Sequence, residues 1–83
     1  MGLDIVELVI RAERTFAFDI SDVDASKFQT VGDLYTYVRE HAPGASEDPR
    51  LWERVVDLVE RETGAPREAI RPEASFVYDL KMD

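Results

Sequence analysis

Few side chains in this sequence have a type and spacing that could perform catalysis. The single histidine, His41, has no cysteine and no second histidine with which to share a metal ion. It lies at the C-terminal end of a segment with helical periodicity, where an imidazole usually serves as a favourable charge. No serine or threonine has a base and an orienting acid at a recognisable spacing, so we identify no nucleophile. The sequence therefore predicts a protein that is not an enzyme.

Three acidic residues alternate along one short segment and could attract a hard cation: Asp19, Asp22 and Asp24. A calcium-binding loop of the common type also needs a glycine at the turn and a closing glutamate, and this segment has neither. A solvated acidic loop is the simpler interpretation. We therefore expect no metal site.

The charge of the chain limits its partners. Eighteen acidic residues against ten basic ones give a net charge of -8. Such a charge repels nucleic acids and anionic lipids and favours partners with a positive surface, although it can also serve only to keep a small domain soluble. The sequence has no apolar run of membrane-spanning length and no secretory signal. We expect a cytoplasmic protein that binds neither nucleic acid nor membrane.

Three segments have apolar residues at helical spacing. The pattern predicts helices over residues 3–16, 31–41 and about 51–63. Thr30 and Asp33 have the spacing of a capping box at the start of the second helix. With no alternating strand pattern, we predict an all-α fold, a small antiparallel helical bundle. The apolar stripe of the first helix comprises Leu3, Val6, Val9, Ile10 and Phe16, widened by Ile5 and Leu8.

Proline and glycine residues mark the connection between the second and third helices. Residues 43–49 have the composition of a linker, and this is the one break in composition along the chain. Asp48 and Pro49 resemble the cap and the first residue of the third helix. Gly64 is expected to end that helix.

The remaining segments are expected to form short turns and an anchored loop. One helical turn is expected around residues 23–27, capped by Ser21 or Asp22, and another near residues 67–70. We expect Trp52 at the centre of the core, where its truncation to alanine would cost about 3 to 5 kcal/mol. The residues expected to anchor the final loop are Phe76, Val77 and Leu80.

The two ends of the chain read as one continuous motif when they are joined head to tail. After Met1 the chain begins GLDIVELV, and it ends DLKMD. In the joined order, an amphipathic helix ends at Gly64, a long loop carries the segment ASFVYDL, and Asp83, Gly2 and Leu3 begin the next helix. In this order the sequence resembles an acyl carrier protein, in which Asp-Ser-Leu begins the second helix.

This resemblance implies a circularly permuted acyl carrier protein. Residues 50–83 would form the first half of the family fold, residues 1–42 the second half, and residues 43–49 the linker that joins the old termini. The expected structure is a single four-helix domain over residues 1–83, with three longer helices and a short one. The permutation could be natural or engineered. The chain could be a monomer, or a dimer that exchanges its two halves.

The resemblance also implies a function and shows where this chain departs from it. Acyl carrier proteins hold acyl groups on 4'-phosphopantetheine, attached to the serine of Asp-Ser-Leu, in fatty-acid or polyketide-type biosynthesis. Gly2 stands at the position of that serine, flanked by Asp83 and Leu3. Glycine has no hydroxyl group, so we expect this chain to carry no phosphopantetheine.

The first helix resembles the recognition helix of the family. Its expected partners are basic surfaces of acyl-chain-processing enzymes or a phosphopantetheinyl transferase. Arg11 and Arg14 depart from the acidic pattern, and a solvated face with i,i+4 pairing of Glu7 and Arg11 is the alternative. A non-carrier protein–protein interaction module that uses this acidic face is the second function that remains open. The expected partner-binding residues are Asp4, Val6, Glu7, Ile10 and Glu13.

Overall fold

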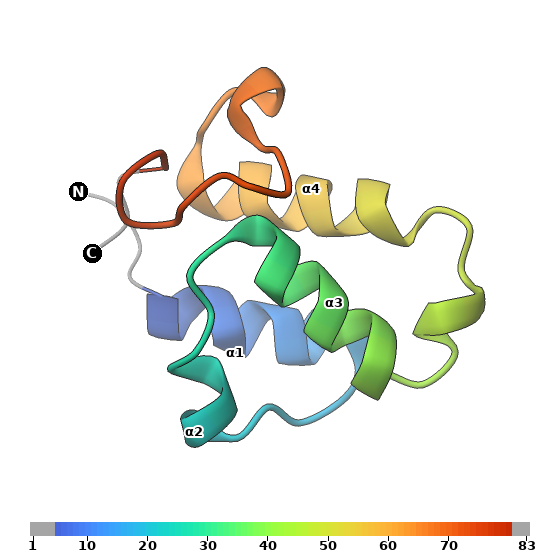
Figure 1. The fold of residues 1–83 in the computed structure, drawn as a ribbon. Coiled ribbons are helices and arrows are strands. Elements are labelled where there is room, and N and C mark those ends of the chain that lie inside the picture. The colour runs from blue at the N-terminus through green and yellow to red at the C-terminus, as the bar shows by residue number, and fades with distance from the viewer. Residues whose placement is uncertain (1–4, 81–83) are drawn as a thin grey trace.

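The chain folds as a bundle of helices in a computed structural model that describes residues 5–80. Within that range no strand is present, and three helices are long and one is short (Figure 1). The all-α prediction is therefore confirmed. The elements in chain order are α1 (Ile5–Phe16), α2 (Asp22–Ala25), α3 (Val31–His41), the 3-10 turn η1 (Ala45–Glu47), α4 (Leu51–Thr63) and the 3-10 turn η2 (Arg67–Ala69).

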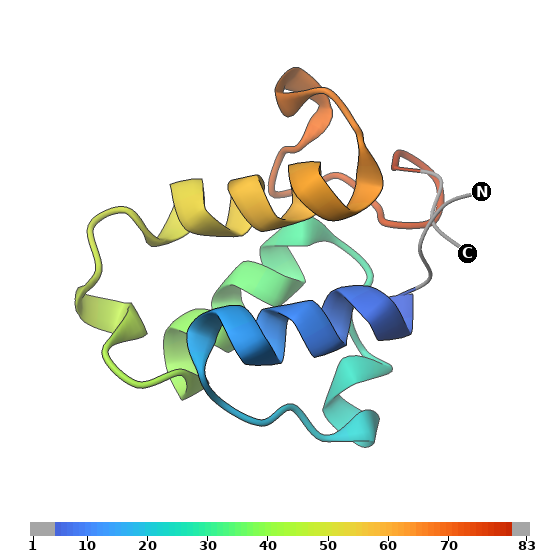
Figure 2. The ribbon, with the colours of Figure 1, turned by 180° about the vertical axis from the view of Figure 1, so that it is seen from behind.

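The helices α1 and α4 run antiparallel, and α3 packs against α4 (Figures 1 and 2). The short helix α2 lies beside the first half of α1, on the side away from α4 (Figures 1 and 2). No helix within residues 5–80 has both the length and the apolar character needed to cross a membrane.

The apolar core is formed by one face of each long helix and by the loop that follows α4. In α1 the most deeply buried residues are Leu8 and Ala12, whereas Val6 and Ile10 are exposed. The buried face of α1 is therefore turned relative to the expected apolar stripe. Val6 and Ile10 lie on the face that adjoins the small helix α2 and not on the face that packs into the core. The core residues that the long helices supply are Leu8, Val9, Ala12, Phe16, Val31, Leu34, Val38, Leu51, Val55, Val56, Leu58 and Val59.

Two predicted helix caps are present. The backbone N–H of Asp33 donates to the Thr30 hydroxyl at 3.2 Å, and the N–H of Thr30 donates to the Asp33 carboxylate at 3.1 Å. This is the complete capping box of α3. Of the two candidates for α2, Ser21 is the cap, since its hydroxyl accepts from the N–H of Asp24 at 3.1 Å.

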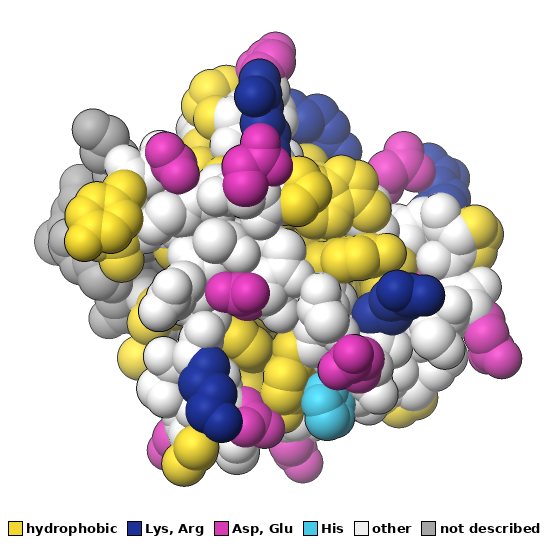
Figure 3. Space-filling model, viewed as in Figure 1, with side chains coloured by type: hydrophobic (Ala, Val, Ile, Leu, Met, Phe, Trp, Pro, Cys, Tyr) yellow, Lys and Arg dark blue, Asp and Glu magenta, His cyan; other side chains and the backbone are white. Residues whose placement is uncertain are grey.

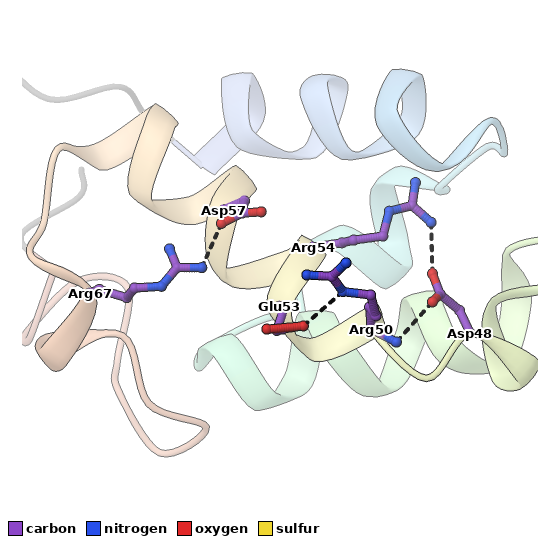
Figure 4. Close-up of polar contacts among 6 residues, drawn as sticks. All are labelled: Asp48, Arg50, Glu53, Arg54, Asp57 and Arg67. Atoms are coloured by element: carbon purple, nitrogen blue, oxygen red, sulfur yellow. Dashed lines mark hydrogen bonds and ion pairs between the residues drawn. The ribbon is translucent and has the colours of Figure 1, made fainter.

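The predicted span of α4, about residues 51–63, agrees with the structure, but the predicted cap and first residue, Asp48 and Pro49, were each two residues too early. The helix begins at Leu51, with Arg50 at the cap position. The Asp48 carboxylate accepts from the N–H of Arg50 at 2.9 Å and pairs with the Arg54 guanidinium at 2.9 Å (Figure 4). Asp48 thus stabilises the turn before the helix. The turn η1 within the linker was not predicted.

Trp52 lies at the edge of the core and not at its centre. The residue is only partly buried, and its ring packs edge-to-face on Tyr35 with centroids 5.4 Å apart. Leu51, Val55 and Val59 are among the α4 residues that face inward, and Trp52 is offset from them around the helix. Figure 3 shows apolar surface over the seam between α3 and α4, surrounded by charges of both signs.

The loop after α4 is anchored by two of the three expected residues. Phe76 and Leu80 are buried, but Val77 is 57% exposed. The Asp79 carboxylate accepts from the N–H of Ser75 at 2.7 Å and so stabilises a turn. This turn presents Phe76 and Leu80 to the core and leaves Val77 at the surface.

Polar contacts also join the same loop to the helices. The predicted turn near residues 67–70 is confirmed as η2, and Arg67 there pairs with Asp57 at 2.6 Å (Figure 4). Arg67 also pairs with Glu60 at 2.7 Å. Further along, the backbone N–H of Gly32 donates to the carbonyl of Pro72 at 2.8 Å. A Cβ atom at Gly32 would lie 2.8 Å from that carbonyl oxygen, so the loop reaches α3 only because residue 32 has no side chain.

Candidate functional site

A half-open groove of about 600 Å³ lies between α1 and α2. Its apolar lining comes mainly from Val6, Val9 and Ile10 of α1. Ile20 and Ala25 line the groove from the α2 side, and the polar residues that line it are Glu13, Asp22 and Ser26. A groove with this lining can hold an apolar group while its rim stays acidic.

Exposed apolar side chains lie along this groove and next to it. Val6 is 59% exposed and Ile10 is 39% exposed. They are four residues apart on α1, so they lie on the same face of the helix. Val23 of α2 is 66% exposed. Single exposed apolar residues are ordinary, but several together beside a groove are typical of a contact surface. Val6 and Ile10, two of the expected partner-binding residues, thus share an accessible face.

Glu13, another expected partner-binding residue, also has a structural contact. Its carboxylate accepts a hydrogen bond from the backbone N–H of Ile20 at 2.7 Å. This bond holds the loop between α1 and α2 against α1. Glu7 is half-buried on α1. Replacing Glu13 would therefore disturb the loop as well as the surface charge.

The expected attachment position lies outside the described residues. Gly2, Leu3 and Asp83 are not among residues 5–80, and neither is Asp4, the first of the expected partner-binding residues. What the structure describes is the helix that follows this position, which begins at Ile5.

Arg11 is directed toward α4. Its Nε atom lies 3.7 Å from a carboxylate oxygen of Glu62, whose side chain is only 6% exposed. Near the other end of the same helix pair, the Arg54 guanidinium lies 4.9 Å from the centre of the Phe16 ring. Sequence reasoning missed both contacts, because each joins residues far apart in the chain. Arg11 therefore contributes to the packing of α1 on α4 as well as to the charge of the α1 surface.

The acidic segment is attached to α3 by a tyrosine. The Tyr37 hydroxyl donates to the Asp24 carboxylate at 2.8 Å. This bond lowers the pKa of Asp24 and raises the pKa of Tyr37. The His41 ring stacks on Tyr37 with centroids 4.1 Å apart. Within residues 5–80, no three His, Cys, Asp or Glu side chains are grouped so that they could hold a metal ion.

Comparison with known proteins gives a partial match. No protein-family model matches the chain, and no solved structure matches it. The chain is 49% identical over 40 residues to the acyl carrier protein of Chlamydia trachomatis serovar L2. The match covers 48% of this chain and 52% of that protein, so the chain spans about half the length of the curated relative. Over that stretch, this chain is therefore a partial homologue of an acyl carrier protein.

Proposed function

We propose that this chain is an acyl-carrier-like domain with its two halves in circularly permuted order. The observation that carries the proposal is the extent of the similarity, since 49% identity extends over only 40 residues. A comparison that follows chain order can align only one half of a permuted protein with its relative at a time. An identity this high that stops after about half of each chain is what such a rearrangement produces.

The arrangement of the helices supports this proposal. The start of α1 and the last described residues of the chain lie at the same end of the bundle (Figures 1 and 2). Residues 43–49 connect α3 to α4, and η1 within them is packed on α3 through the buried Ala45. A short ordered linker in that place is compatible with joining the first and last helices of a carrier fold.

A rearranged chain tests the permutation. Residues 50–83 would be placed first and followed directly by residues 2–42, so that Asp83 precedes Gly2. We expect this chain to retain the helical circular dichroism of the present one and to unfold cooperatively. An unfolded rearranged chain would contradict the proposal. Light scattering of both chains should give the mass of a monomer, 9.5 kDa for the present one. Twice that mass would indicate exchanged halves.

The parent function we propose is the transport of acyl groups in fatty-acid or polyketide-type biosynthesis, in the cytoplasm. The groove between α1 and α2 supports it. Its volume of about 600 Å³ is within the range of about 300 to 1,000 Å³ for small-molecule sites. Its apolar lining suits a hydrocarbon chain.

This chain itself does not fit a covalently attached phosphopantetheine. Attachment forms a phosphate ester with a side-chain hydroxyl, and Gly2 has no oxygen to form it. Incubation with coenzyme A and a phosphopantetheinyl transferase should therefore leave the intact mass unchanged. The variant Gly2→Ser should gain one phosphopantetheine, and Gly2→Ala should gain none. A gain by the unmodified chain, or no gain by Gly2→Ser, would contradict the assigned position.

The second candidate is a non-carrier interaction module. The exposure of Val6 and Ile10 beside acidic residues favours it, because basic partner surfaces commonly meet such a face. Binding to a purified phosphopantetheinyl transferase tests the surface by calorimetry. We expect Glu7→Lys to weaken binding several-fold, and Glu13→Gln to weaken it while keeping an oxygen that accepts from Ile20. Glu40→Lys, the same charge change on α3, is the control. Equal effects at Glu7 and Glu40 would exclude a specific α1 face.

A further inference from the structure

The helix α2 forms one wall of the groove but buries few of its own side chains against the core. None of its four residues is buried, and Ala25 is its only apolar residue packed against the core. Asp22 and Ala25 of α2 line the groove, facing the apolar residues of α1. The apolar anchors of this wall are its neighbours in the chain, the buried Ile20 before α2 and the partly buried Phe28 after it. Polar contacts between the α2 segment and the rest of the bundle therefore add to what holds it in place.

Two side-chain hydrogen bonds supply those contacts. The Glu13 carboxylate on α1 accepts from the N–H of Ile20, just before α2, at 2.7 Å. The Tyr37 hydroxyl on α3 donates to the carboxylate of Asp24, within α2, at 2.8 Å. The side-chain hydrogen bonds of Ser21 and Ser26 stay within the α2 segment and cannot place it relative to the bundle.

Tyr37 is itself held rigidly. Its ring packs edge-to-face on Phe28 with centroids 5.2 Å apart and lies 6.1 Å from the ring of Phe18. On the remaining side His41 stacks on it at 4.1 Å. A hydroxyl on a ring fixed in this way has a defined position, and its bond to a carboxylate is of the stronger, charge-assisted kind.

We propose that Tyr37 is a positioning residue that sets the width of the groove by holding α2 through Asp24. Without the hydroxyl, α2 moves away from α1 more often, and the groove admits longer apolar chains. The identity of the occupant, an acyl chain, rests on the proposed function. The proposed restraint on α2 rests on the hydrogen bond between Tyr37 and Asp24 and not on the proposed function, so the two parts can fail separately.

Hydrogen exchange tests the restraint. Tyr37→Phe keeps the ring and removes the hydroxyl, and we expect several-fold faster exchange at the backbone amides of residues 22–28 with no change in α4. The control is Tyr35→Phe, on the same helix, whose ring packs on Trp52. Unchanged exchange in residues 22–28 of Tyr37→Phe would overturn the proposal. So would faster exchange throughout the chain, since that reports global destabilisation.

A double-mutant cycle tests whether the effect passes through Asp24. Asp24→Ala should accelerate exchange in the same segment as Tyr37→Phe, and the double variant should add little further because both changes remove one bond. Fully additive effects would mean that Tyr37 acts on α2 by another route, which contradicts the proposal.

Binding of S-octanoyl- and S-dodecanoyl-pantetheine tests the consequence for the groove. Relative to the unmodified chain, Tyr37→Phe should favour the dodecanoyl compound over the octanoyl compound by several-fold, and Tyr35→Phe should not. An unchanged ratio would overturn the role of Tyr37 in selecting chain length. If exchange responds as expected and no variant binds either compound, the restraint on α2 is supported and the proposed function is contradicted.

Discussion

Gly32→Ala should destabilise the protein, although alanine is normally the better residue in a helix. Gly32 lies in the first turn of α3, where its N–H donates to the carbonyl oxygen of Pro72 at 2.8 Å. A Cβ atom built at residue 32 would lie 2.8 Å from that same oxygen, a separation that real Cβ atoms essentially never show. The contact is with backbone, so a side-chain rotation cannot relieve it.

The size of the effect follows from three contributions. Forcing the loop away from α3 costs about 1 to 3 kcal/mol, as overpacking usually does. Weakening the hydrogen bond to Pro72 costs about 1 kcal/mol. Replacing glycine by alanine in a helix returns up to about 1 kcal/mol. We therefore expect the free energy of unfolding to fall by about 1 to 3 kcal/mol.

Urea denaturation followed by far-UV circular dichroism measures this change. Thr36→Ala, at an exposed position within α3, is the control and should change the free energy of unfolding by less than about 0.5 kcal/mol. Hydrogen exchange should also accelerate in residues 72–76 of the Gly32→Ala protein. If Gly32→Ala is as stable as the unmodified chain, the reasoning from the close approach is wrong.

Two further predictions concern the linker and the core. The hydrogen bond from Arg54, with that from the backbone of Arg50, holds the pKa of Asp48 below its ordinary value of 3.8. The free energy of unfolding of the unmodified protein should therefore exceed that of Asp48→Asn above pH 3.8. The difference should decline as the pH falls below that value, because the carboxylate becomes protonated, and urea melts across that range measure it. Phe76→Ala should cost about 3 to 5 kcal/mol and Trp52→Ala clearly less, since Phe76 is 1% exposed and Trp52 lies at the core edge; equal losses in the same melts would contradict this order.

The helices and their caps could be predicted because their signals are local. The capping box of α3 needs only Thr30 and Asp33, three residues apart, and both of its hydrogen bonds are present. Gly64 ends α4 as expected, with a positive φ of 73° that glycine adopts without strain. Such features depend on neighbours in the chain, and no tertiary contact is needed to create them.

The surroundings of three individual side chains were predicted wrongly. Trp52 was expected at the centre because it is large and apolar, but the packing of α4 on α1 and α3 turns it toward the edge. Asp48 was expected to cap α4. Its carboxylate instead accepts a hydrogen bond from the backbone N–H of Arg50, before the helix, and pairs with the guanidinium of Arg54 in the first turn of α4. Val77 was expected inside, but the turn closed by Asp79 leaves it exposed.

Only some residues of the candidate site could be predicted from the sequence. The resemblance to an acyl carrier protein directed attention to Val6 and Ile10, and both lie on an accessible face beside the groove. It did not indicate that the Glu13 carboxylate holds the loop at Ile20. It also missed Tyr37, because nothing in the sequence joins a tyrosine on one helix to an aspartate thirteen residues earlier.

The sequence by itself determined where helices form and end, the excess of acid, and the absence of a hydroxyl at Gly2. Periodicity, capping and composition are properties of short segments, so they can be read along the chain. The tertiary structure alone decided which side of α1 is buried, that Arg11 pairs with Glu62, and that Tyr37 contacts α2 beside the groove. These outcomes depend on how the helices pack, and packing brings together residues whose separation in sequence says nothing about their distance in space.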